Sequence, residues 1–149
     1  MRAPARRLMI ATVGTALACL GAALLPWLRT GEASRSAFGL ARSAAVLGLF
    51  DGTPRRLCLA LWYLLPFLVA ATWTAAAAGK PGIAAGIGSV VGLTSLAAGI
   101  VVITLVKAAP GPIAAIVAGG AAMASSTALG RSIKKGRAPA EPPSEGVPI

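Results

Sequence analysis

The sequence predicts an all-α membrane protein with four transmembrane helices and a short interfacial amphipathic helix between the first and the second. Apolar residues make up 56% of its 149 residues, and charged residues make up only 12%. The apolar residues occur in blocks of about twenty, the length at which a helix spans the hydrocarbon core of a bilayer. Most of these blocks are apolar on every side, whereas a water-soluble fold needs helices with a polar face.

The first predicted span covers residues 8–28 and follows a basic cytoplasmic leader, residues 1–7. Three arginines and no acidic residue occupy this leader. A cleaved lipoprotein signal near Cys19 is the alternative. The apolar run continues past that cysteine to Trp27, whereas a mature lipoprotein turns polar at this point. We therefore expect an uncleaved helix.

The second span is expected over residues 57–78 and the third over residues 83–106. The four residues between them, Gly79-Lys80-Pro81-Gly82, should form a turn. Glycine and proline favour turns, and a lysine side chain is costly to place in hydrocarbon.

The fourth span is expected over residues 113–129, which completes a transmembrane domain of residues 8–130. Alanine and glycine supply most of this span, and they favour insertion less than leucine or phenylalanine does. A re-entrant or interfacial segment is the alternative. The cytoplasmic tail, residues 131–149, is basic at first and then proline-rich, a composition typical of disorder.

The connection between the first two spans should contain an extracytoplasmic amphipathic helix over residues 34–50. Ser34 or Ser36 could cap it. Its apolar residues recur at helical spacing, and its arginines share another side. Such a helix is expected in the headgroup region. The candidate contacts with a partner protein or with lipid are Arg29, Arg35, Phe38 and Arg42. A solvated connector with snorkelling arginines is the alternative.

Small residues predict how the helices pack, because close backbone approach holds helices together in lipid. The candidate packing residues of the third span are Gly88, Gly92, Ser95 and Gly99. Alanines repeat every four residues in the fourth span, which favours a tight antiparallel pair of these two helices. Gly14 and Ala18 extend the pattern to the first span. A homo-oligomer through the same small residues is the alternative.

The distribution of cations predicts that both termini are cytoplasmic. With four spans, eight lysines and arginines fall on the inner side and six on the outer side. The basic leader directly beside the first span favours the same orientation. Trp27, Trp62 and Tyr63 should then form an aromatic belt at the outer interface of the plasma membrane.

The residue inventory argues against an enzyme. The chain has no histidine, which excludes imidazole metal sites and Ser/His/Asp catalysis. Cys19 and Cys58 are expected at different depths and should not pair. We therefore expect no cofactor and no bound metal. The net charge of +10 is divided between two membrane faces and lacks stacking aromatics, so nucleic acid is not expected as a partner.

The segment Trp27-x-Arg29-Thr30-Gly31-x-x-x-Arg35-Ser36-x-Phe38 and the alanine-glycine bias resemble small, mostly uncharacterised membrane proteins of high-GC, mycobacterium-like actinobacteria. The resemblance covers a short loop and the general layout. It implies a location in the cell envelope with the loop on the periplasmic side, and it implies no activity.

These observations favour an accessory or interaction subunit that binds other membrane proteins or anionic lipid. The alternative is a subunit of an oligomeric channel or small-solute transporter. The spans carry hydroxyl groups but no Asp, Glu, Lys, Arg or His side chain. This composition disfavours a transport pathway, which usually contains charged or strongly polar groups.

Overall fold

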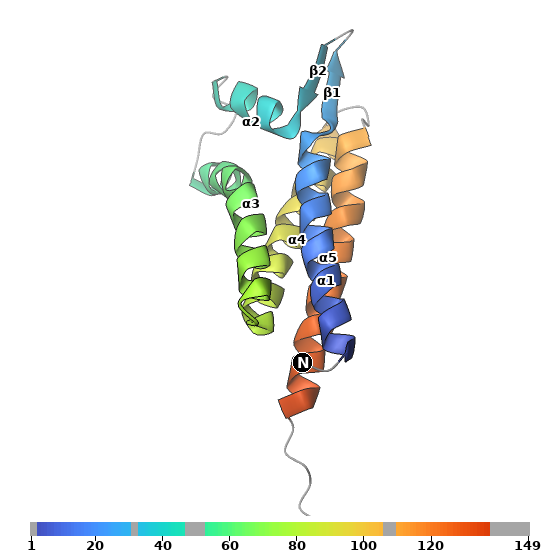
Figure 1. The fold of residues 1–149 in the computed structure, drawn as a ribbon. Helices are drawn as coiled ribbons and strands as arrows, with labels where there is room; N and C mark the ends of the chain where they lie inside the picture. Colours follow the sequence, from blue (N-terminus) through green and yellow to red (C-terminus); the bar gives the residue numbers. More distant parts are fainter. Residues whose placement is uncertain (1–2, 31–32, 47–52, 106–109, 138–149) are drawn as a thin grey trace, which may run out of the picture.

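The computed structural model shows four long helices side by side, with a small cap at one end (Figure 1). It describes residues 3–30, 33–46, 53–105 and 110–137. The long helices are α1 (Ala3–Leu24), α3 (Thr53–Ala77), α4 (Pro81–Leu105) and α5 (Pro110–Arg137). The cap consists of β1 (Pro26–Thr30), β2 (Ala33–Ser36) and α2 (Ala37–Val46).

Three of the long helices are long and apolar enough to cross a membrane. The stretches with this length and composition are Ala5–Leu24 in α1, Pro81–Thr104 in α4 and Pro110–Lys134 in α5. These helices correspond to the first, third and fourth predicted spans. The apolar described part of α3 is shorter, Trp62–Ala77. The predicted second span begins at residue 57, where the side chains of α3 lie largely outside the described residues.

The predicted first span is too long at its C-terminal end. α1 ends at Leu24, and Pro26 follows in β1. Proline has no backbone N–H and its ring clashes with the preceding helical turn, so the helix cannot continue through it. β1 instead pairs antiparallel with β2, with Thr30 opposite Ala33. The helical fold class therefore holds for the described residues except for this one hairpin, which the sequence analysis missed.

The turn between α3 and α4 closes as the sequence predicts. Gly79 adopts a positive φ of 67°. The N–H of Lys80 bonds to the carbonyl of Ala75 at 2.9 Å, and the N–H of Gly79 bonds to that of Ala76 at 3.0 Å. This pair of bonds is a Schellman motif, which satisfies the last carbonyls of α3 and favours glycine at the left-handed position.

α5 extends beyond both predicted ends of the fourth span. It begins at Pro110 and reaches Arg137. Pro110 and Pro112 are tolerated because the first N–H groups of a helix have no intrahelical partner. The helix continues past Leu129, where the apolar run ends, because backbone hydrogen bonds form in polar as well as in apolar stretches. Residues 138–149, where disorder is predicted, lie outside the described residues.

The core lies where α1, α4 and α5 meet, and α3 packs against α1 and α4. α4 and α5 form the most extensive pair, in the antiparallel arrangement that their small residues predict. The fully buried side chains include Leu65 of α3, Val91 of α4 and Leu129 of α5. The cap covers the end of the bundle at which α1 ends and α5 begins (Figure 1).

Candidate interaction surfaces

The amphipathic helix of the cap, α2, is anchored at its first turn by Ser36. The side-chain oxygen of Ser36 accepts the backbone N–H of Gly39 at 3.4 Å, so this serine caps the helix. The helix begins at Ala37 rather than at residue 34, because residues 33–36 pair as β2. Its predicted end at residue 50 lies outside the described residues.

One side of α2 faces the bundle. Ala37 is buried, and Phe38 and Ala41 are half-buried against the main core cluster. The ring centroid of Phe38 lies 6.1 Å from that of Trp62 and 6.5 Å from that of Tyr63, both on α3. These contacts hold α2 against α3. The helical spacing predicts an apolar side of α2, and the structure packs this side against the bundle.

Two arginines of the cap are exposed, Arg42 on α2 and Arg35 on β2. The sequence predicts both in one helix, but Arg35 precedes the helix because residues 33–36 pair as a strand. The guanidinium of Arg35 donates to the hydroxyl of Ser43, and Ser43 donates to the carbonyl of Gly39 at 3.0 Å. Arg29 lies in β1 opposite Ser34, and its side chain is outside the described residues. Phe38 is thus separated from Arg35 and Arg42, because its ring packs against the core while the two arginines are exposed.

The predicted aromatic belt is wrong for its two tryptophans. Trp27 and Trp62 are only 2% and 7% exposed, and their rings meet edge to face at 5.2 Å. The indole N–H of Trp27 donates to the carbonyl of Ala22 at 2.8 Å. The pairing of β1 with β2 is irregular at Trp27, and such a bulge redirects a side chain. Only Tyr63 is exposed.

Gly111 of α5 completes this aromatic layer. A Cβ added to Gly111 would lie 2.7 Å from the indole nitrogen of Trp27 and 2.8 Å from the carbonyl oxygen of Pro26. The start of α5 therefore rests directly on β1. The sequence predicts the fourth span only from residue 113, because the spacing of the preceding Pro-Gly-Pro segment gives no indication of the distant tryptophan.

The four small residues predicted to pack, Gly88, Gly92, Ser95 and Gly99, are all buried in α4. A Cβ on Gly92 would lie 2.8 Å from the carbonyl oxygen of Gly119, and a Cβ on Gly99 would lie 2.7 Å from that of Pro112. These two glycines thus lie against the backbone of α5.

Gly88 and Ser95 meet polar side chains rather than a bare backbone. A Cβ on Gly88 would lie 2.7 Å from the hydroxyl oxygen of Ser126 and 2.8 Å from the methyl group of Thr12. Ser95 is fully buried beside Cys19 of α1. Gly14, which the sequence pattern also assigned to packing, has no neighbour within 4 Å of an added Cβ.

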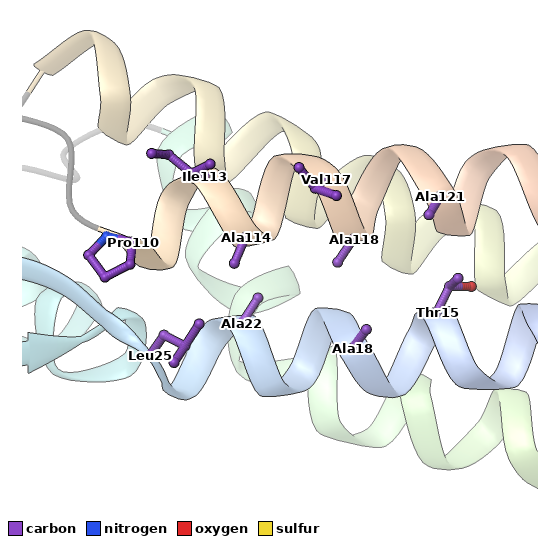
Figure 2. A pocket seen from close by; sticks show the side chains of 10 residues that line it. All are labelled: Thr15, Ala18, Ala22, Leu25, Pro110, Ile113, Ala114, Val117, Ala118 and Ala121. Atoms are coloured by element: carbon purple, nitrogen blue, oxygen red, sulfur yellow. The ribbon is translucent and has the colours of Figure 1, made fainter.

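A groove of about 640 Å³ runs between α1 and α5 (Figure 2). Thr15 supplies the one hydroxyl among its lining side chains, and this hydroxyl already bonds to Ser125 of α5 at 3.1 Å. The groove is lined by Thr15, Ala18, Ala22, Leu25, Pro110, Ile113, Ala114, Val117, Ala118 and Ala121. This lining matches hydrocarbon and supplies no group for acid–base or nucleophilic chemistry.

Within the described parts of the chain, no three His, Cys, Asp or Glu side chains gather where they could hold a metal ion. The four acidic residues, Glu32, Asp51, Glu141 and Glu145, all lie outside the described residues. No protein-family model, no curated protein and no solved structure matches the chain. The surfaces above are therefore interpreted from their own chemistry.

Proposed function

We propose that the chain is a multi-spanning protein of the plasma membrane, in which α3 crosses the bilayer with α1, α4 and α5. α3 has 25 residues. At 1.5 Å per residue this is about 37 Å, longer than a hydrocarbon core of about 30 Å. Phe67 and Trp73 are 70% and 58% exposed on α3, side chains suited to lipid rather than to water.

We propose further that the protein acts as an accessory or interaction subunit and that α2 is its contact surface for another membrane protein. The observation that carries this proposal is a pair of exposed arginines in the cap, Arg35 on β2 and Arg42 on α2, beside a helix whose other side is packed against the bundle. A guanidinium presents several N–H donors in a planar fork that matches a carboxylate. Because α2 is packed against the bundle and Arg35 bonds to its Ser43, the cap presents both forks with little further loss of conformational freedom.

The chemistry of the contact follows from the charges. A carboxylate-bearing surface on a partner would engage the donors of Arg42 and compete with Ser43 for those of Arg35. Since a carboxylate is the matching partner of a guanidinium, the proposed partner surface is acidic and lies at the same depth as the cap, beside the membrane.

Crosslinked affinity purification from native membranes tests this function. The double charge reversal Arg35→Glu with Arg42→Glu should reduce recovery of a defined partner at least tenfold, because each like-charge contact at an interface is costly. Both side chains are exposed, so the variant should keep its abundance and thermal stability. The matched control is Arg131→Glu with Lys134→Glu at the opposite end of the bundle. Equal recovery from the wild type and the Arg35/Arg42 variant would refute the proposal.

A further inference from the structure

The end of the bundle opposite the cap carries a cluster of cations, which we call the basic end. Five exposed side chains form it: Arg6, Arg7, Lys80, Arg131 and Lys134. They come from three places in the fold: the start of α1, the α3–α4 turn and the last turns of α5 (Figure 1).

Packing in the bundle brings these three places to one end. Met9 and Val13 of α1 pack against a small buried cluster of Ala75, Ala76 and Ala84, which joins the start of α1 to the helices on either side of the turn. The contacts of Trp27 with Gly111 and of Thr15 with Ser125 show that α5 runs antiparallel to α1. The residues that follow Ser125 therefore run toward the first turns of α1.

The described residues of the basic end carry charge of a single sign. No acidic side chain is present in the described chain to neutralise these five cations. Helix stability does not account for all of them. Arg131 and Lys134 suit the negative end of the α5 dipole, but Arg6 and Arg7 lie near the positive end of the α1 dipole, where cations are disfavoured.

Exposed apolar side chains lie immediately beside the cations. Ile10 is 62% exposed within one turn of Arg6 and Arg7, and Ile83 is 53% exposed three residues after Lys80. Such a change from alkyl groups to ammonium and guanidinium groups over one helical turn matches the boundary between acyl chains and phosphates in a bilayer.

We propose that the basic end binds the headgroups of anionic phospholipids, with the phosphates seated among Arg6, Arg7, Lys80, Arg131 and Lys134. This inference rests on the membrane location proposed above but not on a protein partner for α2. The surface selects negatively charged over zwitterionic lipid, and it places the start of α1 and the end of α5 in the leaflet richer in anionic lipid.

Lipid retention in nanodiscs tests the inference. The full chain is reconstituted in equal parts of phosphatidylglycerol and phosphatidylcholine, in which both leaflets are identical and orientation has no effect. Lipids that remain on the protein are then counted by native mass spectrometry. We expect the wild type to retain phosphatidylglycerol preferentially. At low salt the preference should fall about fivefold for each cation removed, in Arg6→Gln with Arg7→Gln and in Arg131→Gln with Lys134→Gln.

Arg35→Gln with Arg42→Gln, at the cap, is the matched control and should keep the preference. Inserted wild-type protein without a preference for phosphatidylglycerol would overturn the inference and leave the membrane location intact. Protein absent from the discs would overturn both. If the wild type showed no preference for phosphatidylglycerol but the Glu141→Gln with Glu145→Gln variant did, the inference would also be overturned. The basic end would then bind the carboxylates of the tail instead of lipid.

Discussion

Gly92 and Gly86 lie on the same helix, α4, in different surroundings. A Cβ on Gly92 would lie 2.8 Å from the carbonyl oxygen of Gly119 and 2.9 Å from the backbone nitrogen of Met123. A Cβ on Gly86 would have no neighbour within 4 Å. Because the atoms against Gly92 belong to the backbone of α5, they cannot rotate away as a side chain would.

The Gly92→Ala substitution should therefore separate α4 from α5 and lower the free energy of unfolding by about 1–3 kcal/mol. Gly86→Ala should change it by less than about 1 kcal/mol, in the stabilising direction, because alanine favours a helix more than glycine does. Thermal unfolding in detergent measures both. Equal stability of the two variants would contradict the close approach at Gly92.

The burial of a single residue was predictable where a sequence repeat indicates one face of a helix. It was not predictable where burial depends on a segment far away in the sequence. The buried face of α4, with Gly88, Gly92 and Gly99, follows from spacing alone. Gly14 shows the same kind of spacing and is exposed, because no helix lies against that side of α1. The burial of Trp27 depends on Trp62, 35 residues further along the chain, and no local pattern reports such a pair.

At the scale of elements, α2 is a short helix that depends on its cap and on its contact with the bundle. Ser36→Ala removes the acceptor for the N–H of Gly39. The loss should cost about 1 kcal/mol and speed hydrogen exchange of the first α2 amides about fivefold. Mass spectrometry of exchanged peptides measures this change.

Ser132→Ala is the control, since the hydroxyl of Ser132 bonds only to the carbonyl of Leu129 in its own helix. Exchange in α5 should stay within a factor of two of the wild type, as expected for a surface substitution. Unaltered protection of α2 in Ser36→Ala would show that packing by Phe38 alone holds this helix.

The elements themselves were predicted to within a few residues where hydropathy and helix formation coincide, as in α4. They were mispredicted where the two diverge. Hydropathy continues through Pro26 to Leu28 although the helix stops, and it falls after Leu129 although α5 continues to Arg137. The two residues between Thr30 and Ala33 include Gly31, and a two-residue connection with glycine is a hairpin signal that was available in the sequence.

For the whole molecule, the number of crossings can be tested by the accessibility of introduced cysteines. Three long helices separate Arg42 from Lys134, so four spans place these residues on opposite sides of the membrane. In a background with Cys19→Ala and Cys58→Ala, an impermeant maleimide on intact cells should label Arg42→Cys. It should label Lys134→Cys only after permeabilisation.

Arg7→Cys serves as the reference because it lies near the start of α1, at the same end of the bundle, and should behave like Lys134→Cys. Labelling of Arg42→Cys and Lys134→Cys from the same side would show that one of the three intervening helices does not cross. α5 would then be the first helix to examine, since alanine and glycine supply most of its predicted span.

The whole candidate site could be predicted only in part. The sequence places Arg35 and Arg42 on one side of a helix and Phe38 on another; the structure agrees for Arg42 and Phe38, whereas Arg35 lies in β2. The four predicted spans already place Arg6, Lys80 and Arg131 on the same side of the membrane, whereas their position at one end of the bundle depends on helix packing.

The Schellman turn at Gly79 also bears on how the protein enters the bilayer. So few residues join α3 to α4 that the two helices form a hairpin whose arms cannot be far apart. The less apolar arm, α3, is held in lipid more firmly when the more apolar α4 enters with it. During synthesis, α3 is therefore expected to partition stably only once α4 has left the ribosome, a delay that force measurements on arrested nascent chains would detect.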